Sequence, residues 1–167
     1  MPDAKIIIVA AHSENRFIGK GGTIPWRVKR DFKFWQDISR GKPVIMGRKT
    51  FEDMPPSFKK RDKIIVVTRD TSYTYDGVRV VHSMDDAFNA AHEYKSAEII
   101  IGGGAQIYKQ ALSQAHEMFL STIHTKIDGD AAFPEYDPDE WMEVTSQDFK
   151  AEEGDTCGFT LRKYIRK

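Results

Sequence analysis

The sequence predicts an α/β protein: a single domain over residues 1–167 with a mixed, mainly parallel twisted sheet, flanking helices and a C-terminal antiparallel hairpin. Up to about residue 123, short apolar runs alternate with segments of helical spacing, as is typical of parallel strands joined by crossover helices. The chain then ends in two longer segments of strand character. A length of 167 residues suits one hydrophobic core, and no internal repeat or linker divides it.

The run Lys5–Ala11 is almost wholly apolar, which predicts a first strand buried on both faces. Further strands of this kind are expected at Pro43–Met46, Lys63–Thr68, Val78–Val81, Glu98–Ile101 and Met118–Ile123. The last two strands, Trp141–Lys150 and Thr156–Ile165, are joined through Glu152-Glu153-Gly154. This short, glycine-containing connection predicts that they pair as a hairpin.

A helix is expected at Arg30–Ser39, because Phe32, Trp35 and Ile38 recur with helical spacing. Gly41-Lys42-Pro43 ends this helix, since glycine and proline both interrupt helical structure. Other helices are expected from near Lys49, from the capping box Ser83-Met84-Asp85-Asp86 to about Tyr94, and from Ala105.

The segment Ser13–Arg27 is polar and contains Gly19, Gly21 and Gly22. We expect it to be a long loop without secondary structure. Loops of this length inside a small domain are often functional, so the segment is a candidate part of a binding site.

Composition excludes some classes of partner. Twenty-five basic and 25 acidic residues give a net charge of zero, so we expect no global attraction to nucleic acid or to an anionic membrane. No apolar run is long enough to span a bilayer. Cys157 is the only cysteine, which rules out an intrachain disulfide and favours a reducing, cytoplasmic setting. The five histidines have no metal-binding spacing, and no metal is expected.

Asp31 is a candidate catalytic acid, because it is the one carboxylate in a segment rich in aromatic residues. Four of these lie close to it in sequence: Trp26, Phe32, Phe34 and Trp35. A carboxylate held against aromatic walls loses hydration, which raises its pKa and suits it to a cationic or proton-accepting ligand. The alternative is an ordinary acid in the first turn of an amphipathic helix, stabilised by the helix dipole.

Two strand–glycine–helix junctions are candidate phosphate sites. The first contains Gly47 and the second Gly102-Gly103-Gly104. Amides at a helix N-terminus bind phosphate, and glycine allows a close approach. Arg48 and Lys49 add positive charge at the first junction, and Thr50 adds a hydroxyl. Each junction alone could be a plain tight turn, but two of them favour an extended polyphosphate ligand. Neither fits the dinucleotide fingerprint or the P-loop.

A third candidate anion site lies at the carboxyl end of the strand that finishes at Thr68. Arg69 follows it, and ligands of open α/β sheets bind at such strand ends. Arg48 and Arg69 could meet there over one anion, such as a 2′-phosphate. The alternative is two unrelated surface arginines, and Arg61, taken alone, belongs to a solvated loop.

These residues fall into an ordered set of segments that resembles dihydrofolate reductase over nearly the whole chain. The matching segments are Asn15–Gly19, Ile24–Trp26, Asp31, Lys42–Glu52, Ile64–Arg69, Gly103–Tyr108 and Gly129–Pro134. Their order and distances together are highly specific. The resemblance implies that NADPH reduces 7,8-dihydrofolate to tetrahydrofolate, with hydride passing to C6 of the pteridine and a proton arriving at N5.

The resemblance also implies roles for particular residues. Asp31 would be the only acid of the pterin pocket, Trp26 would order water beside it, and Ser121 would link the acid to the pterin. Ile24 would be the tip of a mobile loop that closes over the site and excludes water. A monomer is expected.

The implied substrate contacts, besides Asp31 and Ser121, are Val9 and Ala10 at the pterin, Phe32, Trp35, Met54 and Phe58 around the aminobenzoyl group, and Arg61 at the carboxylate of the glutamate tail. The implied cofactor contacts are Ala11 and Ile18 at the carboxamide, Arg48, Thr68 and Arg69 at the 2′-phosphate, and Gly47, Lys49, Thr50, Gly103, Gly104, Ala105, Gln106 and Ile107 along the rest of the cofactor. In the family a cis peptide joins the pair that matches Gly103-Gly104. Asp130 would brace the mobile loop near Gly19.

Three places depart from the family pattern. Lys29 stands where proline is common, Gly102 replaces a bulkier residue, and 55–61 lacks the usual Pro-Leu-Pro-Gly-Arg. These departures bear on reaction rates, affinity for the glutamate tail and inhibitor response more than on the reaction itself. Two alternatives stay open. One is a pterin or pyrimidine reductase of related fold, as in riboflavin synthesis, and the other is a non-catalytic nucleotide-binding module.

Overall fold

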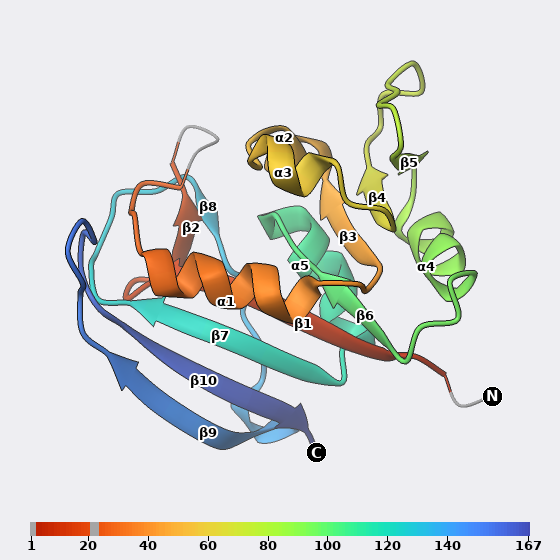
Figure 1. Ribbon diagram of the computed structural model, residues 1–167. Coiled ribbons are helices and arrows are strands. Elements are labelled where there is room, and N and C mark those ends of the chain that lie inside the picture. The colour runs from red at the N-terminus through yellow and green to blue at the C-terminus, as the bar shows by residue number, and fades with distance from the viewer. Residues whose placement is uncertain (1–2, 21–23) are drawn as a thin grey trace.

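The computed structural model describes residues 3–20 and 24–167, so Gly21 and Gly22 of the expected loop lie outside the described residues. Its centre is an eight-stranded sheet in the order β5-β4-β3-β6-β1-β7-β10-β9 (Figure 1). The strands of this sheet are β1 (Lys5–Ser13), β3 (Val44–Gly47), β4 (Ile64–Val67), β5 (Arg79–Val81), β6 (Glu98–Ile101), β7 (Glu117–Ile123), β9 (Trp141–Phe149) and β10 (Phe159–Arg166).

Six of the eight strands run parallel, from β5 to β7, and β10 and β9 add an antiparallel edge. This confirms the predicted fold class, a mainly parallel sheet with a C-terminal hairpin. The helices that cover the sheet are α1 (Lys29–Ser39), α2 (Arg48–Glu52), α3 (Pro56–Lys59), α4 (Met84–His92) and α5 (Ala105–Ala111).

Successive side chains of β1 enter two different cores, because the side chains of a strand alternate between the faces of its sheet. Ile6 and Ile8 pack in one core with residues of α4 and α5. Ile7 and Val9 pack in the other with Trp35 and residues of α2 and α3. Helices α1, α2 and α3 therefore cover one face, and α4 and α5 cover the other (Figure 1).

The structure differs from the prediction in the expected loop Ser13–Arg27. This segment contains a short strand, β2 (Phe17–Gly19), which pairs with β8 (Ala131–Ala132) in a second, two-stranded sheet. A pair this short has no periodicity to detect in the sequence. The helix α3 also went undetected, as did the 3₁₀ turns Leu112–Gln114 and Pro138–Glu140. Among the described residues, no helix has the length and apolar character needed to cross a membrane.

The expected strand Thr156–Ile165 also begins later, at Phe159, because its first residues are used to anchor α1. The Thr156 hydroxyl accepts a hydrogen bond from the Arg27 amide at 3.0 Å, and the Thr156 amide donates to the Arg27 carbonyl at 2.8 Å. The Lys29 amide donates to Oδ1 of Asp155 at 3.0 Å. Proline, which is common at this position in the family, has no N–H to make this bond. Lysine at position 29 therefore supplies an anchor for the helix start that proline could not.

Candidate active site

A cavity of about 620 Å³ opens at the carboxyl ends of β1 and β6, where α1 faces the end of the loop 13–27. Most of the predicted site residues line it. They are Val9, Ala10, Ala11, Ile18, Ile24, Trp26, Asp31, Phe32, Trp35, Lys49, Thr50, Met54, Gly103, Gly104 and Ala105. The walls are mainly apolar, as is usual for a small-molecule site.

Asp31 projects into this cavity from the first turn of α1. Burial raises the pKa of Asp31 to about 6, and a hydrogen bond with the Ser121 side chain opposes this shift. Ser121 lies beside Ala11 in the β1–β7 pairing and is almost fully buried. Desolvation is the larger of these two effects at Asp31, and its direction is opposite to the lowering of pKa that a helix dipole gives an acid in the first turn.

Tyr108, the last residue of the matched segment Gly103–Tyr108, completes the inner wall, and no role was predicted for it from the sequence. It lines the cavity from α5, and its hydroxyl donates to the Val9 carbonyl at 2.8 Å. Burial, with a smaller effect from Asp31, raises the pKa of Tyr108, so the phenol stays neutral. A Cβ on Gly103, whose φ is 105°, would lie 3.0 Å from this hydroxyl. The peptide Gly103-Gly104 is cis, as the resemblance implied.

The outer wall of the cavity is built around Trp35. Its ring packs against Phe58, with centroids 5.1 Å apart, and Phe58 is buried behind it rather than lining the cavity. Arg61 also lies outside the cavity lining. Its guanidinium donates to the Ser39 hydroxyl at 2.9 Å and to the Gln36 carbonyl at 3.2 Å, and it stacks on Phe58. These bonds fix Arg61 at the end of α1, beside the outer part of the site.

Gly102 allows Trp35 to sit deep in this wall. A Cβ at position 102 would lie 2.9 Å from Cζ2 of Trp35 and 3.2 Å from atoms of Val44 and Met46. We expect Gly102→Ala to lower the free energy of unfolding by about 1–3 kcal/mol, because the added methyl overpacks the wall. Trp35→Phe removes Cζ2, so a double-mutant cycle by urea unfolding should show a smaller effect of Gly102→Ala in that background. Equal effects in the two backgrounds would contradict this contact.

The loop 13–27 is held to the rest of the chain near both of its ends. Near its start, the Gly19 carbonyl accepts a hydrogen bond from the Asp130 amide at 3.1 Å. A Cβ at Gly129 would lie 2.6 Å from the same carbonyl, so this close contact requires glycine. At its end, Arg27 is bound to Thr156 as described above. Between these anchors, Ile24 lines the cavity with 64% of its surface exposed.

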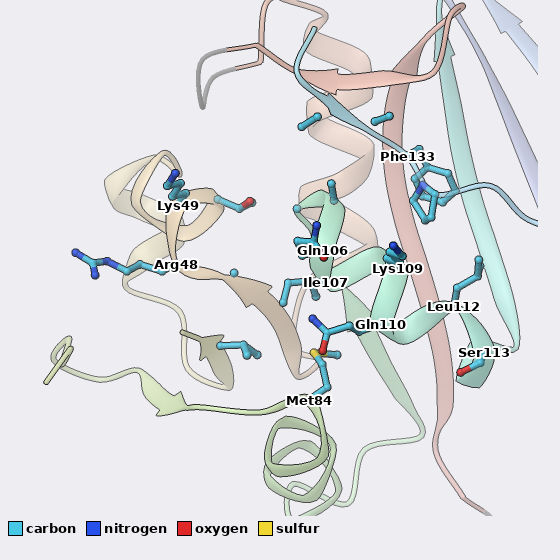
Figure 2. A pocket seen from close by; sticks show the side chains of 18 of the residues that line it. Arg48, Lys49, Met84, Gln106, Ile107, Lys109, Gln110, Leu112, Ser113 and Phe133 are labelled. Atoms are coloured by element: carbon cyan, nitrogen blue, oxygen red, sulfur yellow. The ribbon is translucent and has the colours of Figure 1, made fainter. Parts of the chain in front are cut away.

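A second hollow, a groove of about 2,230 Å³, lies beside the cavity. Figure 2 shows side chains that line this groove. The two hollows share lining residues, among them Lys49, Thr50, Gly104 and Ala105, so the groove and the cavity border the same segments of the chain. The groove is lined by these predicted cofactor residues: Gly47, Arg48, Lys49, Thr50, Thr68, Arg69, Gly104, Ala105, Gln106 and Ile107.

The two glycine junctions meet in the groove. The Gly47 amide donates to the Gly103 carbonyl at 2.7 Å, which joins the end of β3 to the start of the second junction. The Gly47 N–H is thus engaged within the protein rather than offered to a ligand. Figure 2 shows Arg48 and Lys49 at the start of α2, across from Gln106 and Ile107 on α5.

Arg48 and Arg69 line the same end of the groove, together with Thr68. His82 and Ser83 also line this end, and no sequence signal pointed to either. Nδ1 of His82 lies 2.8 Å from the Thr68 carbonyl oxygen. Among the described residues, no three His, Cys, Asp or Glu side chains gather as a metal site.

The site combines an acid of raised pKa in an apolar cavity with an adjoining groove that carries arginines at the ends of parallel strands. These features define a class of protein. It is an α/β enzyme that holds an extended anionic cofactor beside a small substrate. Comparison with known proteins names the family. The family described as dihydrofolate reductase matches residues 5–166, and the chain belongs to it.

The relatives and a solved structure agree with this assignment. The chain is 40% identical to the dihydrofolate reductase of Neisseria gonorrhoeae over 84% of its own length and 85% of that protein. It is 32% identical to a dihydrofolate reductase of Staphylococcus aureus, over 96% and 97%. A structure of Enterococcus faecalis dihydrofolate reductase complexed with NADP(H) and RAB-propyl has a TM-score of 0.86 and 28% identity, over 98% and 96%.

Family membership makes the chain an NADPH-dependent oxidoreductase that reduces dihydrofolate to tetrahydrofolate. It confirms the resemblance found in the sequence. It does not support either alternative, the related pterin or pyrimidine reductase and the non-catalytic nucleotide-binding module.

Proposed function

We propose that the cavity holds the pterin of dihydrofolate and that Asp31 is its catalytic acid group. The observation that carries this assignment is the carboxyl of Asp31, whose pKa is raised to about 6 in an apolar cavity. Such a group binds the polar amidine edge of a pterin, its 2-amino group and N3, and stabilises the substrate protonated at N5. Bound NADPH supplies the hydride, and water delivers the proton.

The other residues of the cavity support this chemistry. Ser121 keeps the Asp31 carboxyl oriented through their hydrogen bond. Val9 and Ala10 border the pterin, while Phe32, Trp35 and Met54 line the region proposed for the aminobenzoyl group, with Phe58 behind Trp35 and Arg61 at the glutamate tail. Ile24 closes over the pterin to exclude water, and Trp26 orders the water beside Asp31.

The groove suits an extended cofactor because it lies beside the cavity proposed for the pterin and shares lining residues with it. We propose that Ala11 and Ile18 hold the carboxamide, that 103–107 with Lys49 and Thr50 border the pyrophosphate, and that Thr68 with the two arginines binds the 2′-phosphate. Arginine suits this last role, because its planar fork bonds phosphate in two places.

An absorbance assay tests the proposed reaction. The purified chain should oxidise NADPH, followed at 340 nm (the absorbance maximum of the reduced nicotinamide), only when dihydrofolate is added. Absence of oxidation with dihydrofolate would exclude this function.

The proposed 2′-phosphate site makes a separate prediction. We expect the double variant Arg48→Ala/Arg69→Ala to lower the preference for NADPH over NADH, measured as the ratio of kcat/KM, by about 10- to 100-fold. Turnover at saturating cofactor should change little, because neither arginine lies in the cavity of Asp31. An unchanged preference would refute the assignment.

We also propose that the chain is a monomeric, single-domain cytoplasmic protein that binds small molecules rather than nucleic acid. One continuous sheet joins β1 near the start to β10 near the end, which supports a single domain. The net charge of zero supports the absence of a nucleic-acid partner. Sedimentation of the purified chain tests the monomer.

A further inference from the structure

The guanidinium of Arg48 is paired with two carboxylates. Nε donates to Oε1 of Glu52 at 2.8 Å, one turn further along α2, and Nη1 pairs with Oδ2 of Asp70 at 3.2 Å. The face of the guanidinium packs on the Tyr73 ring, with Cζ 4.4 Å from its centroid. The arginine expected to bind the 2′-phosphate is thus already bound to two anions of the protein itself.

Asp70 is the more fixed of these two anions. Its Oδ1 accepts hydrogen bonds from the Ser72 amide at 2.9 Å and the Ser72 hydroxyl at 2.6 Å, which leaves Oδ2 turned to Arg48. The bonds from Ser72 also lower the pKa of Asp70, which favours its charged form. Glu52 has the longer side chain, and it is about as exposed as Asp70, at 45% against 43%.

Charge at this end of the groove is balanced before any ligand arrives. Arg48, Lys49 and Arg69 bring three positive charges to the lining, and Glu52 and Asp53 of the lining, together with Asp70 paired with Arg48, bring three negative ones. Asp70 follows Thr68 and Arg69 directly in the chain, so its charge lies close to the residues assigned to the 2′-phosphate. A phosphate group placed here meets a carboxylate as well as the arginines.

We propose that Asp70 is a specificity-determining residue that competes with the 2′-phosphate for Arg48 and so narrows the preference for NADPH over NADH. This inference rests on the proposed role of Arg48 and Arg69. The competing idea is that Asp70 only holds Arg48 ready for the ligand. The two ideas predict opposite changes in affinity for the 2′-phosphate when the Asp70 charge is removed. Loss of a competitor strengthens binding, whereas loss of a support weakens it.

The variant Asp70→Asn separates these ideas, because asparagine keeps an oxygen for the Ser72 bonds and loses the charge. Binding is measured by calorimetry with 2′,5′-ADP and 5′-AMP, which differ only in the 2′-phosphate. We expect the dissociation constant for 2′,5′-ADP to fall about two- to fivefold, as suits an exposed ion pair, and that for 5′-AMP to stay unchanged. The gain should shrink at high ionic strength, because salt screens exposed charges.

Glu143→Gln is the matched control. It removes an exposed carboxylate from an ion pair of similar length, 3.3 Å to Arg162, and neither residue lines the groove. It should leave both dissociation constants unchanged. Asp70→Ser, which also removes the charge and retains a turn-forming side chain, should reproduce the gain of Asp70→Asn.

The variant Arg48→Ala distinguishes a failure of this inference from a failure of the proposed 2′-phosphate site. If Arg48→Ala leaves 2′,5′-ADP binding unchanged, the 2′-phosphate assignment itself is wrong. If Arg48→Ala weakens binding while Asp70→Asn weakens it or leaves it unchanged, the site stands and competition by Asp70 is refuted. Stronger binding by Asp70→Asn, lost in the double variant with Arg48→Ala, supports the inference.

Discussion

Turnover of the Asp31→Asn variant at pH 7 should fall by about 10²- to 10⁴-fold, the range over which a positioned acid–base group contributes to catalysis. Asparagine retains the shape of the side chain and an oxygen for the Ser121 bond, but it carries no charge to stabilise a substrate protonated at N5. Activity should recover in part in acid, where the free substrate is itself protonated. A pH profile of kcat from 5 to 8 measures both effects.

Asp37→Asn is the control for this experiment. Asp37 lies on the same helix, but it is exposed and paired with Lys33 and Arg40. Its substitution should leave the pH profile of turnover unchanged. Full activity of Asp31→Asn at pH 7 would remove Asp31 from the mechanism.

The same substitution should stabilise the fold at neutral pH. The pKa of Asp31 is raised from 3.8 to about 6, so the folded chain holds its proton where the unfolded chain has already lost it. Stability contributed by the protonated carboxyl is therefore complete below about pH 4 and is lost as the pH rises through 6. At pH 7 ionised Asp31 costs about 3 kcal/mol, and we expect Asp31→Asn to recover up to about that amount.

Urea unfolding at pH 4 and pH 7 measures this difference. The free energy of unfolding of Asp31→Asn should exceed that of the parent at pH 7 and nearly equal it at pH 4. Asp37→Asn should show no gain at pH 7, because hydrogen bonds from Lys33 and Arg40 lower the pKa of Asp37 and its charge is favourable. An Asp31→Asn variant less stable than the parent at pH 7 would show that desolvation does not dominate at this acid.

The sheet could be predicted from the sequence because its strands are buried on both faces. Ile6 to Val9 alternate between two cores, so every position of that run needs an apolar residue and the run is easily recognised. The pair β2–β8 left no such pattern, since its few residues are held by contacts between distant segments. The late start of β10 has the same origin, because Thr156 is engaged by Arg27.

The site was predicted in part from chemistry and in part from resemblance. The position of Asp31 among aromatic residues was a physical indication of a binding site. It was ambiguous because aromatic residues on a helix can equally belong to the core, as Phe32 illustrates. Phe32 shares the helical spacing of the core residues, yet it is 39% exposed and lines the cavity. Ser121 and Tyr108 carry no local signal, because only the fold brings a strand residue and a helix residue to the cavity. The contact of Asp70 with Arg48 depends on the fold in the same way, since 22 positions separate the two residues.

The bonds that hold the start of α1 join residues almost at opposite ends of the chain. The amide of Arg27 reaches Thr156 across 129 positions, and that of Lys29 reaches Asp155 across 126. During synthesis Asp155 and Thr156 emerge long after α1, so these bonds cannot fix the helix that carries Asp31 until residue 156 has been made. Contacts between such distant positions also slow folding, because a long loop must close before they form. A nascent chain that stops before residue 155 would hold most of the sheet and still lack the anchors of its active site.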